Sequence, residues 1–207
     1  MQTTTLTLLA AATLAVGMPL TAAAQTEEIS YDFVEFSYAS TEADIGDVDI
    51  DGKAVDFEAS FEIRKNIHLA ASLFRGEADD LPDTDELTKT FGIGAHFKPG
   101  DRWSPWGQIG FIDVDVDVQN VNASDDGFYA SGGVRFVPAR GYEIRAGAMY
   151  YELDEGADDT IVSVAGDISL TDVVALTLSY SEGDNSEALA VGFRFYFGKN
   201  APRGFRR

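Results

Sequence analysis

The stretch that decides the fold runs from Lys53 to Arg64 and reads KAVDFEASFEIR. Apolar and polar side chains alternate from Val55 to Arg64: Val55, Phe57, Ala59, Phe61 and Ile63 point one way, and Asp56, Glu58, Ser60, Glu62 and Arg64 point the other. A period of two is that of a β-strand whose two faces meet different surroundings. The segment 86–98 repeats the pattern. We call the odd and even positions of a segment its two parities, and Lys89 is the one charge on the apolar parity of this segment. Both segments predict strands, and no helical period of useful length interrupts the chain.

Segments with this alternation recur from residue 29 to residue 197. There are ten, at roughly 29–40, 53–64, 67–76, 86–98, 104–118, 127–137, 141–152, 160–169, 173–182 and 186–197. A tilted membrane strand needs about 9 to 11 residues, which each segment supplies. We predict an all-β fold, a closed antiparallel up-and-down transmembrane β-barrel of ten strands. Eight strands are the alternative if two segments pair outside the membrane.

Two of the segments change phase. In the first, the apolar side chains move from odd to even positions after Phe33, and in the fifth they do so after Phe111. A β-bulge, or an extension of the strand above the membrane, would produce this shift.

The connectors between the segments alternate in length. The short ones are 65–66, 99–103, 138–140 and 170–172, and the mostly longer ones are 41–52, 77–85, 119–126, 153–159 and 183–185. Outer-membrane barrels combine short periplasmic turns with longer outer loops in this way. An even number of strands also returns both termini to the periplasm.

The first 24 residues contain no charged side chain, and an apolar run from Leu6 to Leu20 ends before Ala22-Ala23-Ala24-Gln25. This pattern predicts a secretory signal peptide with an A-x-A cleavage site. The alternative, a membrane anchor, needs an apolar span of about 20 residues. We expect a cleaved signal at 1–24, the barrel at 25–198 and a basic periplasmic tail at 199–207.

Composition excludes several classes of function. The chain has 207 residues, no cysteine and a formal net charge of -20. Disulfide scaffolds, thiolate metal sites and cysteine nucleophiles are therefore excluded. Nucleic acid is excluded as a partner, since neutralising phosphates requires clusters of Lys and Arg.

Alternation alone does not say which face is wet, because a soluble sandwich or lipocalin-like barrel has the same period with its apolar face inward. Aromatic residues on the apolar parity gather toward both strand ends, as two membrane interfaces require. The other parity is rich in Gly, Ser and Thr. Its charges have both signs and could pair across an enclosed lumen: Asp56, Glu58, Glu62, Arg135, Glu143, Arg145, Asp167 and Arg194. These features favour the membrane barrel.

Over residues 27–198 the chain resembles the small Gram-negative outer-membrane β-barrel superfamily of the OmpA/OmpX type. The resemblance rests on the signal peptide, the strand alternation, the connector lengths and the aromatic-rich last strand ending at Phe197. More narrowly, SYDFVE at 30–35, DVDIDG at 47–52 and NIHL at 66–69 are similar to acidic barrels described as regulated by a diffusible signal factor. The resemblance implies the cell outer membrane and insertion by the barrel-assembly machinery. The basic tail after Phe197 departs from the terminal aromatic of the family.

Carboxylates concentrate around the longer connectors, which hold 24 of the 35 acidic residues together with their adjoining strand ends. Only Lys53, Arg75 and Lys89 offset them there. An acidic outer rim could bind Ca²⁺ or Mg²⁺ and bridge to lipopolysaccharide phosphates. The alternative is a solvated acidic surface.

Asp47, Asp49 and Asp51, followed by Gly52 and Glu58, match the letters of an EF-hand loop. The flanks alternate as strands, so the two helices are missing, and Glu58 would lie about 20 Å along a strand. A weak open cation site at Asp47, Asp49 and Asp51 remains as a hypothesis. No other cofactor and no catalytic residue is predicted.

The two histidines of the chain, His68 and His96, fall on the polar parity of neighbouring strands beside short connectors. We expect them to face each other in the lumen as packing or hydrogen-bonding residues. Omptin proteases and lipid A-modifying barrels place their catalytic histidine at the outer end, which is the wrong end here.

The leading functional hypothesis is a non-enzymatic barrel with a structural or surface-interaction role. The runner-up is a narrow passive porin-like channel for small solutes. A surface hydrolase or lipid-modifying enzyme, and a soluble periplasmic binding barrel, follow. The expected partners are outer-membrane lipid and lipopolysaccharide, and the barrel is expected to be a monomer.

Overall fold

The structure is a computed structural model that describes residues 29–45, 48–79, 84–99, 102–118, 121–154 and 156–197. The expected signal peptide and the basic tail lie outside these residues. In this part of the chain no helix is both long enough and apolar enough to cross a lipid bilayer.

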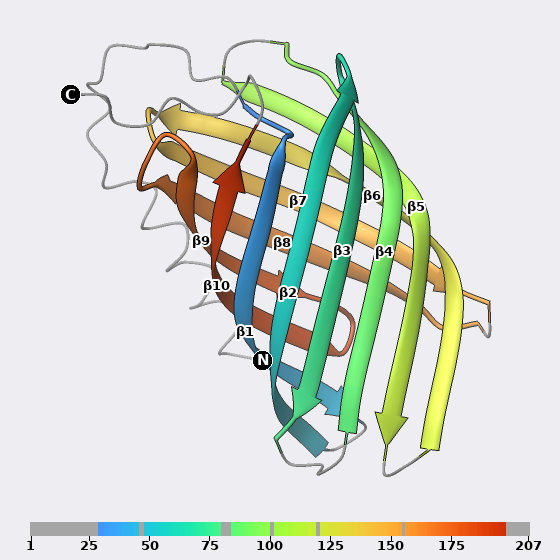
Figure 1. Cartoon of the computed structure of the whole chain (residues 1–207). Coiled ribbons are helices and arrows are strands. Elements are labelled where there is room, and N and C mark those ends of the chain that lie inside the picture. Colours follow the sequence, from blue (N-terminus) through green and yellow to red (C-terminus); the bar gives the residue numbers. More distant parts are fainter. Residues whose placement is uncertain are drawn as a thin grey trace.

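Ten strands follow one another along the described chain (Figure 1). They are β1 (Phe33–Ile45), β2 (Val48–Arg64), β3 (Ile67–Ala78), β4 (Thr84–His96), β5 (Trp103–Val118), β6 (Val121–Ala139), β7 (Tyr142–Leu153), β8 (Asp158–Ser169), β9 (Val174–Glu182) and β10 (Ser186–Tyr196). Each pairs antiparallel with its neighbours in the chain, and β1 also pairs with β10. The sheet is a closed barrel, as the sequence predicts, and it has no open edge along the paired registers.

The connections after β2, β4, β6 and β8 lie at one end of the barrel, which we call the turn end. The connections after β1, β3, β5, β7 and β9 lie at the other, the loop end. At the turn end, Asn66 and Gly141 adopt positive φ angles of 68° and 78°. Tight hairpin turns place residues in this backbone region, and Asn and Gly enter it most readily.

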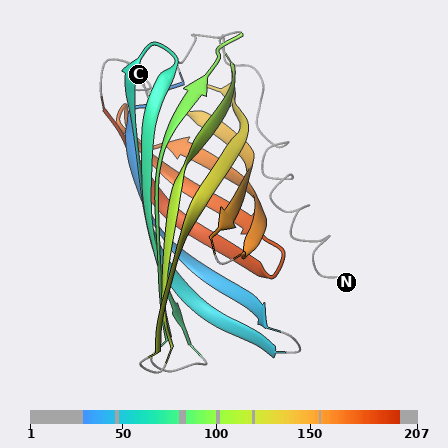
Figure 2. The same ribbon diagram turned by 90° about the vertical axis from the view of Figure 1, so that its right-hand side faces the viewer.

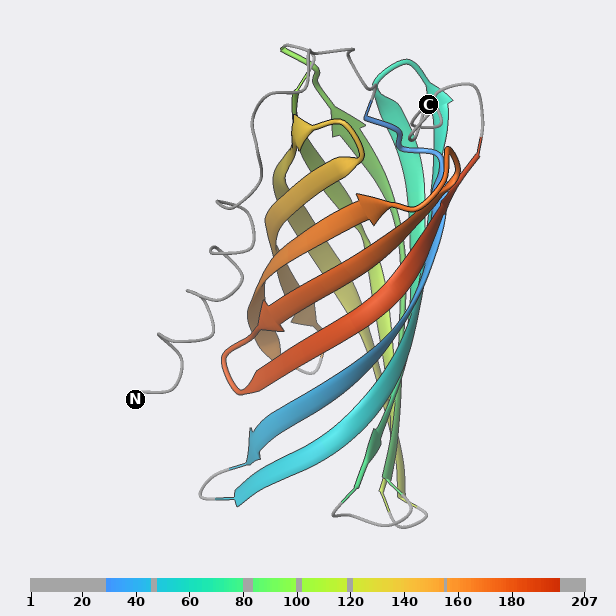
Figure 3. The ribbon, with the colours of Figure 1, turned by 90° about the vertical axis from the view of Figure 1, so that its left-hand side faces the viewer.

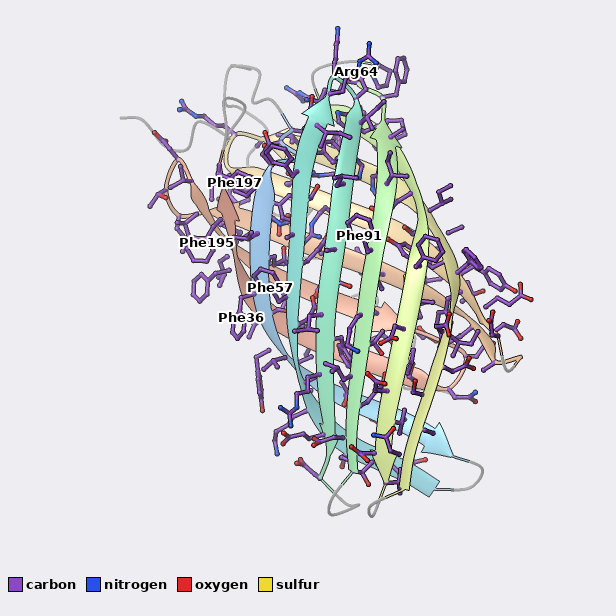
Figure 4. All side chains as sticks on the ribbon, turned by 45° about the vertical axis from the view of Figure 1, so that its right-hand side comes forward. Phe36, Phe57, Arg64, Phe91, Phe195 and Phe197 are labelled. Atoms are coloured by element: carbon purple, nitrogen blue, oxygen red, sulfur yellow. The ribbon has the colours of Figure 1, made fainter. Side chains whose placement is uncertain are left out.

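The apolar face points outward over the body of the barrel. Ile109, Phe111 and Phe128 are 64, 61 and 61% exposed, and Figure 4 shows Phe36 and Phe195 directed away from the ribbon. The opposite parity is buried and carries charge, with Arg194 fully enclosed. This inside-out arrangement excludes the soluble barrel. Aromatic residues lie on the outer face near both ends, for example Tyr150 near the loop end and Phe97 at the turn end.

The hairpins from β1 to β6 extend farther at the loop end than the hairpins from β7 to β10 (Figures 2 and 3). Strands β2, β5 and β6 have 17, 16 and 19 residues, whereas β9 has 9. The prediction of long connectors at 41–52 and 119–126 was therefore wrong, since both ranges are mostly strand. Cross-strand pairing satisfies backbone groups that a loop would leave to water.

The phase change in β5 is an extension of the strand and not a bulge. Its register with β6 is continuous from Trp103↔Phe136 to Val118↔Val121. Asp113 therefore lies on the same outer face as Phe111, and the inner parity becomes apolar. We call residues 112–118 of β5, with the paired parts 84–90 of β4 and 121–127 of β6, the loop-end extension.

The first predicted strand begins later than expected. Residues 29–32 are buried but belong to no strand, and β1 starts at Phe33. Ile29 and Tyr31 pack with Val137 and Trp106 inside the barrel at the turn end. The apolar residues before the phase change thus point inward because they close the lumen.

Candidate functional site in the barrel lumen

Four charged side chains from β1, β7, β8 and β10 meet in the middle of the lumen, and we call them the central network. Arg194 donates from Nε to Oε2 of Glu35 at 2.6 Å. Arg145 donates from Nη2 to the same oxygen at 3.2 Å and from Nε to Oδ2 of Asp167 at 2.9 Å. Thr177 donates to Oδ1 of Asp167 at 2.7 Å.

The central network joins strands that do not neighbour each other. Arg145 on β7 reaches Glu35 on β1, so this ion pair spans the interior and does not run along the wall. Buried charges are tolerated only when they are paired and hydrogen-bonded. The side chains of Arg194, Glu35 and Asp167 are 0, 7 and 2% exposed.

One part of the network is not saturated. Nη1 and Nη2 of Arg194 have no hydrogen-bond partner, although Oε2 of Glu58 lies 3.9 Å from Nη2. The guanidinium carbon of Arg194 lies 3.8 Å from the ring centroid of Phe33. The aromatic face offsets part of the cost of enclosing the cation.

A second layer closes the turn end. Arg135 donates from Nε to Glu143 at 2.5 Å and from Nη2 at 3.0 Å. The ring of Tyr31 stacks on His96, with centroids 3.8 Å apart and planes at 5°. It also stacks on His68 at 4.9 Å. Arg135 lies 4.6 Å from the centroid of the Tyr31 ring.

The chain before β1 is anchored within this layer. Arg135 donates from Nη1 to the carbonyl oxygen of Ser30 at 2.7 Å. The Tyr31 hydroxyl is 2.9 Å from the Ser104 hydroxyl. The carboxylate of Asp32 accepts the backbone N–H of Glu62 at 2.7 Å. These bonds hold residues 29–32 across the lumen, and we call this arrangement the turn-end plug.

The sequence-based prediction of paired lumen charges is confirmed for Arg135 with Glu143 and for Arg145 with Asp167. The predicted meeting of His68 and His96 is also confirmed, with their Nδ1 atoms 3.5 Å apart. Glu35, which contacts both central arginines, was missed. It occupies the parity opposite to Phe36 and Tyr38, and the phase change in the first segment obscured that signal.

The hypothetical cation site at Asp47, Asp49 and Asp51 is described only in part. Asp47 lies outside the described residues, while Asp49 and Asp51 are exposed residues of β2. Among the residues that the structure describes, no group of three His, Asp or Glu side chains is arranged to hold a metal ion. The three-aspartate site therefore stays a prediction.

The outer face of the loop-end extension is acidic, and one lysine on it is paired with two carboxylates. Nζ of Lys89 lies 2.7 Å from Oδ1 of Asp113 and 2.6 Å from Oδ2 of Asp115. The hydrogen bond from Lys89 and its charge hold the pKa of Asp115 below its ordinary value. Carboxylates of the same rim also engage Lys53 and Arg75 through Asp79 and Asp85.

A family model described as outer membrane protein beta-barrel domain matches residues 8–181 of the chain. A comparison with curated proteins returns no match.

Solved structures with a similar arrangement include Neisserial surface protein A, with 18% identity, a TM-score of 0.40, and coverage of 81% of this chain and 98% of that one. The N-terminal β-barrel domain of Pseudomonas aeruginosa OprF has 12% identity and a TM-score of 0.42, covering 80% and 98%. The KdgM porin in complex with disordered oligogalacturonate has 8% identity and a TM-score of 0.47, covering 80% and 99%.

Proposed function

Since this chain belongs to the family of outer membrane protein beta-barrel domains and lies in the cell outer membrane, we propose that it serves as a non-enzymatic barrel with a structural or surface-interaction role. The observation that carries the proposal is the closure of its lumen by two layers of paired side chains. An open pore needs a continuous polar path, whereas here the charged groups form ion pairs with one another.

The two layers close the lumen at different heights. The central network ties β1, β7, β8 and β10 together through Glu35, Arg145, Asp167 and Arg194. The turn-end plug adds a segment of backbone across the lumen, held by Arg135. Removing one partner of a buried ion pair costs about 3–5 kcal/mol, so each layer contributes to holding the lumen closed.

The surface role belongs to the loop end, which faces outward if the short turns are periplasmic. The extended hairpins carry a line of carboxylates on β5, Asp113, Asp115 and Asp117, of which Lys89 engages the first two. Divalent cations are expected to bridge such carboxylates to lipopolysaccharide phosphates. Lipid and lipopolysaccharide are thus the proposed partners, with the barrel-assembly machinery acting during insertion.

Planar-bilayer conductance tests the closed lumen. We expect the purified barrel to insert without resolvable conductance steps. A triple variant Glu35→Ser, Arg145→Ser, Arg194→Ser removes three of the four members of the central network. Adding Tyr31→Ala removes the aromatic contacts of the plug as well. The resulting quadruple variant is expected to conduct. The matched control, Lys89→Ser with Asp113→Ser, alters an ion pair on the outer face and should remain silent. Steady conductance by the unmodified protein would contradict the proposal.

A narrow channel is the second candidate, and one observation favours it. The two unpaired nitrogen atoms of Arg194 are polar groups that require water, so the central lumen is expected to hold some solvent. Glu58 adds a carboxylate beside them. A conducting lumen should then prefer cations, which reversal potentials in a KCl gradient would reveal.

Two further expectations stay open to direct tests. Catalysis is not proposed, because both histidines are buried at the turn end and away from the acidic rim. Regulation by a diffusible signal factor, which the narrower resemblance implies, predicts a change in transcript level when the factor is added.

A further inference from the structure

His68 and His96 form a buried pair whose two Nδ1 atoms face each other. The two residues lie on the adjacent strands β3 and β4 and are 3 and 5% exposed. Their Nδ1 atoms point at each other across 3.5 Å. Space for the His68 ring comes from Gly94, its partner in register, where any Cβ would collide with that ring.

A carboxylate lies near the outer nitrogen of His96. Oε2 of Glu62 lies 3.7 Å from Nε2 of His96. A neutral imidazole with its proton on Nε2 would face this carboxylate and present a lone pair from Nδ1. Gln108 lies close enough to act on the ring of His68. Partners of this kind orient histidines in metal sites.

The distance between the two nitrogens is compatible with one shared metal ion. A hydrogen bond between ring nitrogens is usually about 2.7–3.2 Å long, which is shorter than the separation found here. Two imidazole nitrogens bound to one Zn²⁺ at about 2.0–2.1 Å in tetrahedral geometry lie about 3.4 Å apart. The observed 3.5 Å matches the second arrangement.

Aromatic and charged groups surround the pair. Two cations, Lys98 and Arg135, act on His96, and Arg135 is paired with Glu143 through two hydrogen bonds. The ring of Tyr31 stacks on both imidazoles and presents its electron-rich face to them. Among the described residues no third His, Asp or Glu completes a cluster, so the remaining positions belong to water.

We propose that His68 and His96 bind one transition-metal ion of the Zn²⁺ or Cu²⁺ class through their two Nδ1 atoms. Imidazole nitrogen suits these ions, whereas the acidic rim suits Ca²⁺ and Mg²⁺. The bound ion joins β3 to β4 beneath Tyr31 and so fastens the turn-end plug. This site is separate from the three-aspartate hypothesis and does not depend on whether the lumen conducts.

The test uses the mature chain without a histidine tag, stripped with chelator in detergent and titrated with Cu²⁺ in excess Mg²⁺. The excess Mg²⁺ occupies carboxylates. Because the chain has two histidines and no cysteine, any nitrogen signal from imidazole reports this pair alone. Electron paramagnetic resonance should show one Cu²⁺ coupled to two imidazole nitrogens. A spectrum with oxygen ligands alone, or with one nitrogen, would overturn the proposal without any variant.

Variants then assign the ligands. His68→Gln and His96→Gln should each weaken Zn²⁺ binding at least about tenfold, measured by competition with a chelating dye. Asp113→Asn on the outer face is the matched control and should bind as the parent does. Heat-modifiable gel migration verifies that each variant is folded. Equal Zn²⁺ affinity in a folded His68→Gln, His96→Gln double variant would also overturn the site.

Discussion

Strand β5 alternates between apolar and polar residues along its whole length, but its two halves turn their apolar residues to opposite faces of the sheet. From Trp103 to Phe111 the outer face is apolar, and Ile109 and Phe111 are 64 and 61% exposed. From Asp113 onward the outer face carries carboxylates, and the inner face is built from Ile112, Val114 and Val116. The register with β6 does not break between the two halves.

The comparison teaches that the solvent, and not the strand, decides which face is apolar. At the level of the lipid, apolar side chains contact acyl chains and charges turn inward to pair. In the loop-end extension water lies outside, so the polarity reverses as it does in a soluble sheet. A reversal of polarity at constant register therefore marks where β5 leaves the membrane.

The largest expected effect contrasts a cation of the lumen with a cation of the extension. Arg194→Leu removes one of the two arginines that contact Glu35 and Asp167, which leaves an excess of buried negative charge against Arg145 alone. It should lower the free energy of unfolding by about 3–5 kcal/mol. Arg75→Leu, on the outer face and 55% exposed, should cost less than about 1 kcal/mol. Urea titration in lipid vesicles, followed by tryptophan fluorescence, measures both. Similar costs for the two variants would mean that the central network is hydrated and open.

The second effect contrasts the outer faces of the two halves of β5. Ile109→Arg places a charge against lipid and should lower the free energy of unfolding by about 2–4 kcal/mol near the bilayer midplane. Asp117→Arg, on the same face but in the extension, should change it by less than about 0.5 kcal/mol. The same vesicle titration applies. If Asp117→Arg proved the more damaging, the assigned membrane boundary would be wrong.

A smaller effect probes the inner face of the extension. Val116→Asp brings a second carboxylate opposite Glu86 in register and should destabilise the protein by about 1 kcal/mol or less. Val116→Thr removes no volume and adds no charge, so it is the control. A shift of the urea midpoint that disappears at low pH, where both acids are protonated, identifies repulsion as the cause.

The smallest effect concerns the ion pair of Lys89 with Asp113 and Asp115. Lys89→Met should raise the pKa of Asp115, whose lowered value rests first on the hydrogen bond from Lys89. The stabilising contribution of that bond is complete above the ordinary carboxyl range and is lost as the pH falls through the lowered pKa. NMR titration of the Asp115 carboxyl carbon measures the change, and Arg75→Met is the control. An unchanged titration would show that the contact is not populated.

Much of the fold could be predicted because a period of two in KAVDFEASFEIR leaves few other structures. The ten segments, the barrel closure and the lumen placement of Arg145 and Asp167 all follow from parity. The cation site at Asp47, Asp49 and Asp51 remains undecided. Glu35 and the turn-end plug were missed, because parity counting assumes one solvent on each face, and residues 29–32 leave the wall altogether.

By itself the sequence determined that this chain forms a membrane barrel, since alternation, connector spacing and aromatic placement are local properties that survive without knowledge of contacts. Only the tertiary structure decided which charges meet across the lumen, how Tyr31 stacks on the two histidines, and where β5 leaves the lipid. Those features depend on strands brought together by closure and register. Pairing Glu35 with Arg145 across 110 residues is invisible to any pattern read along the chain.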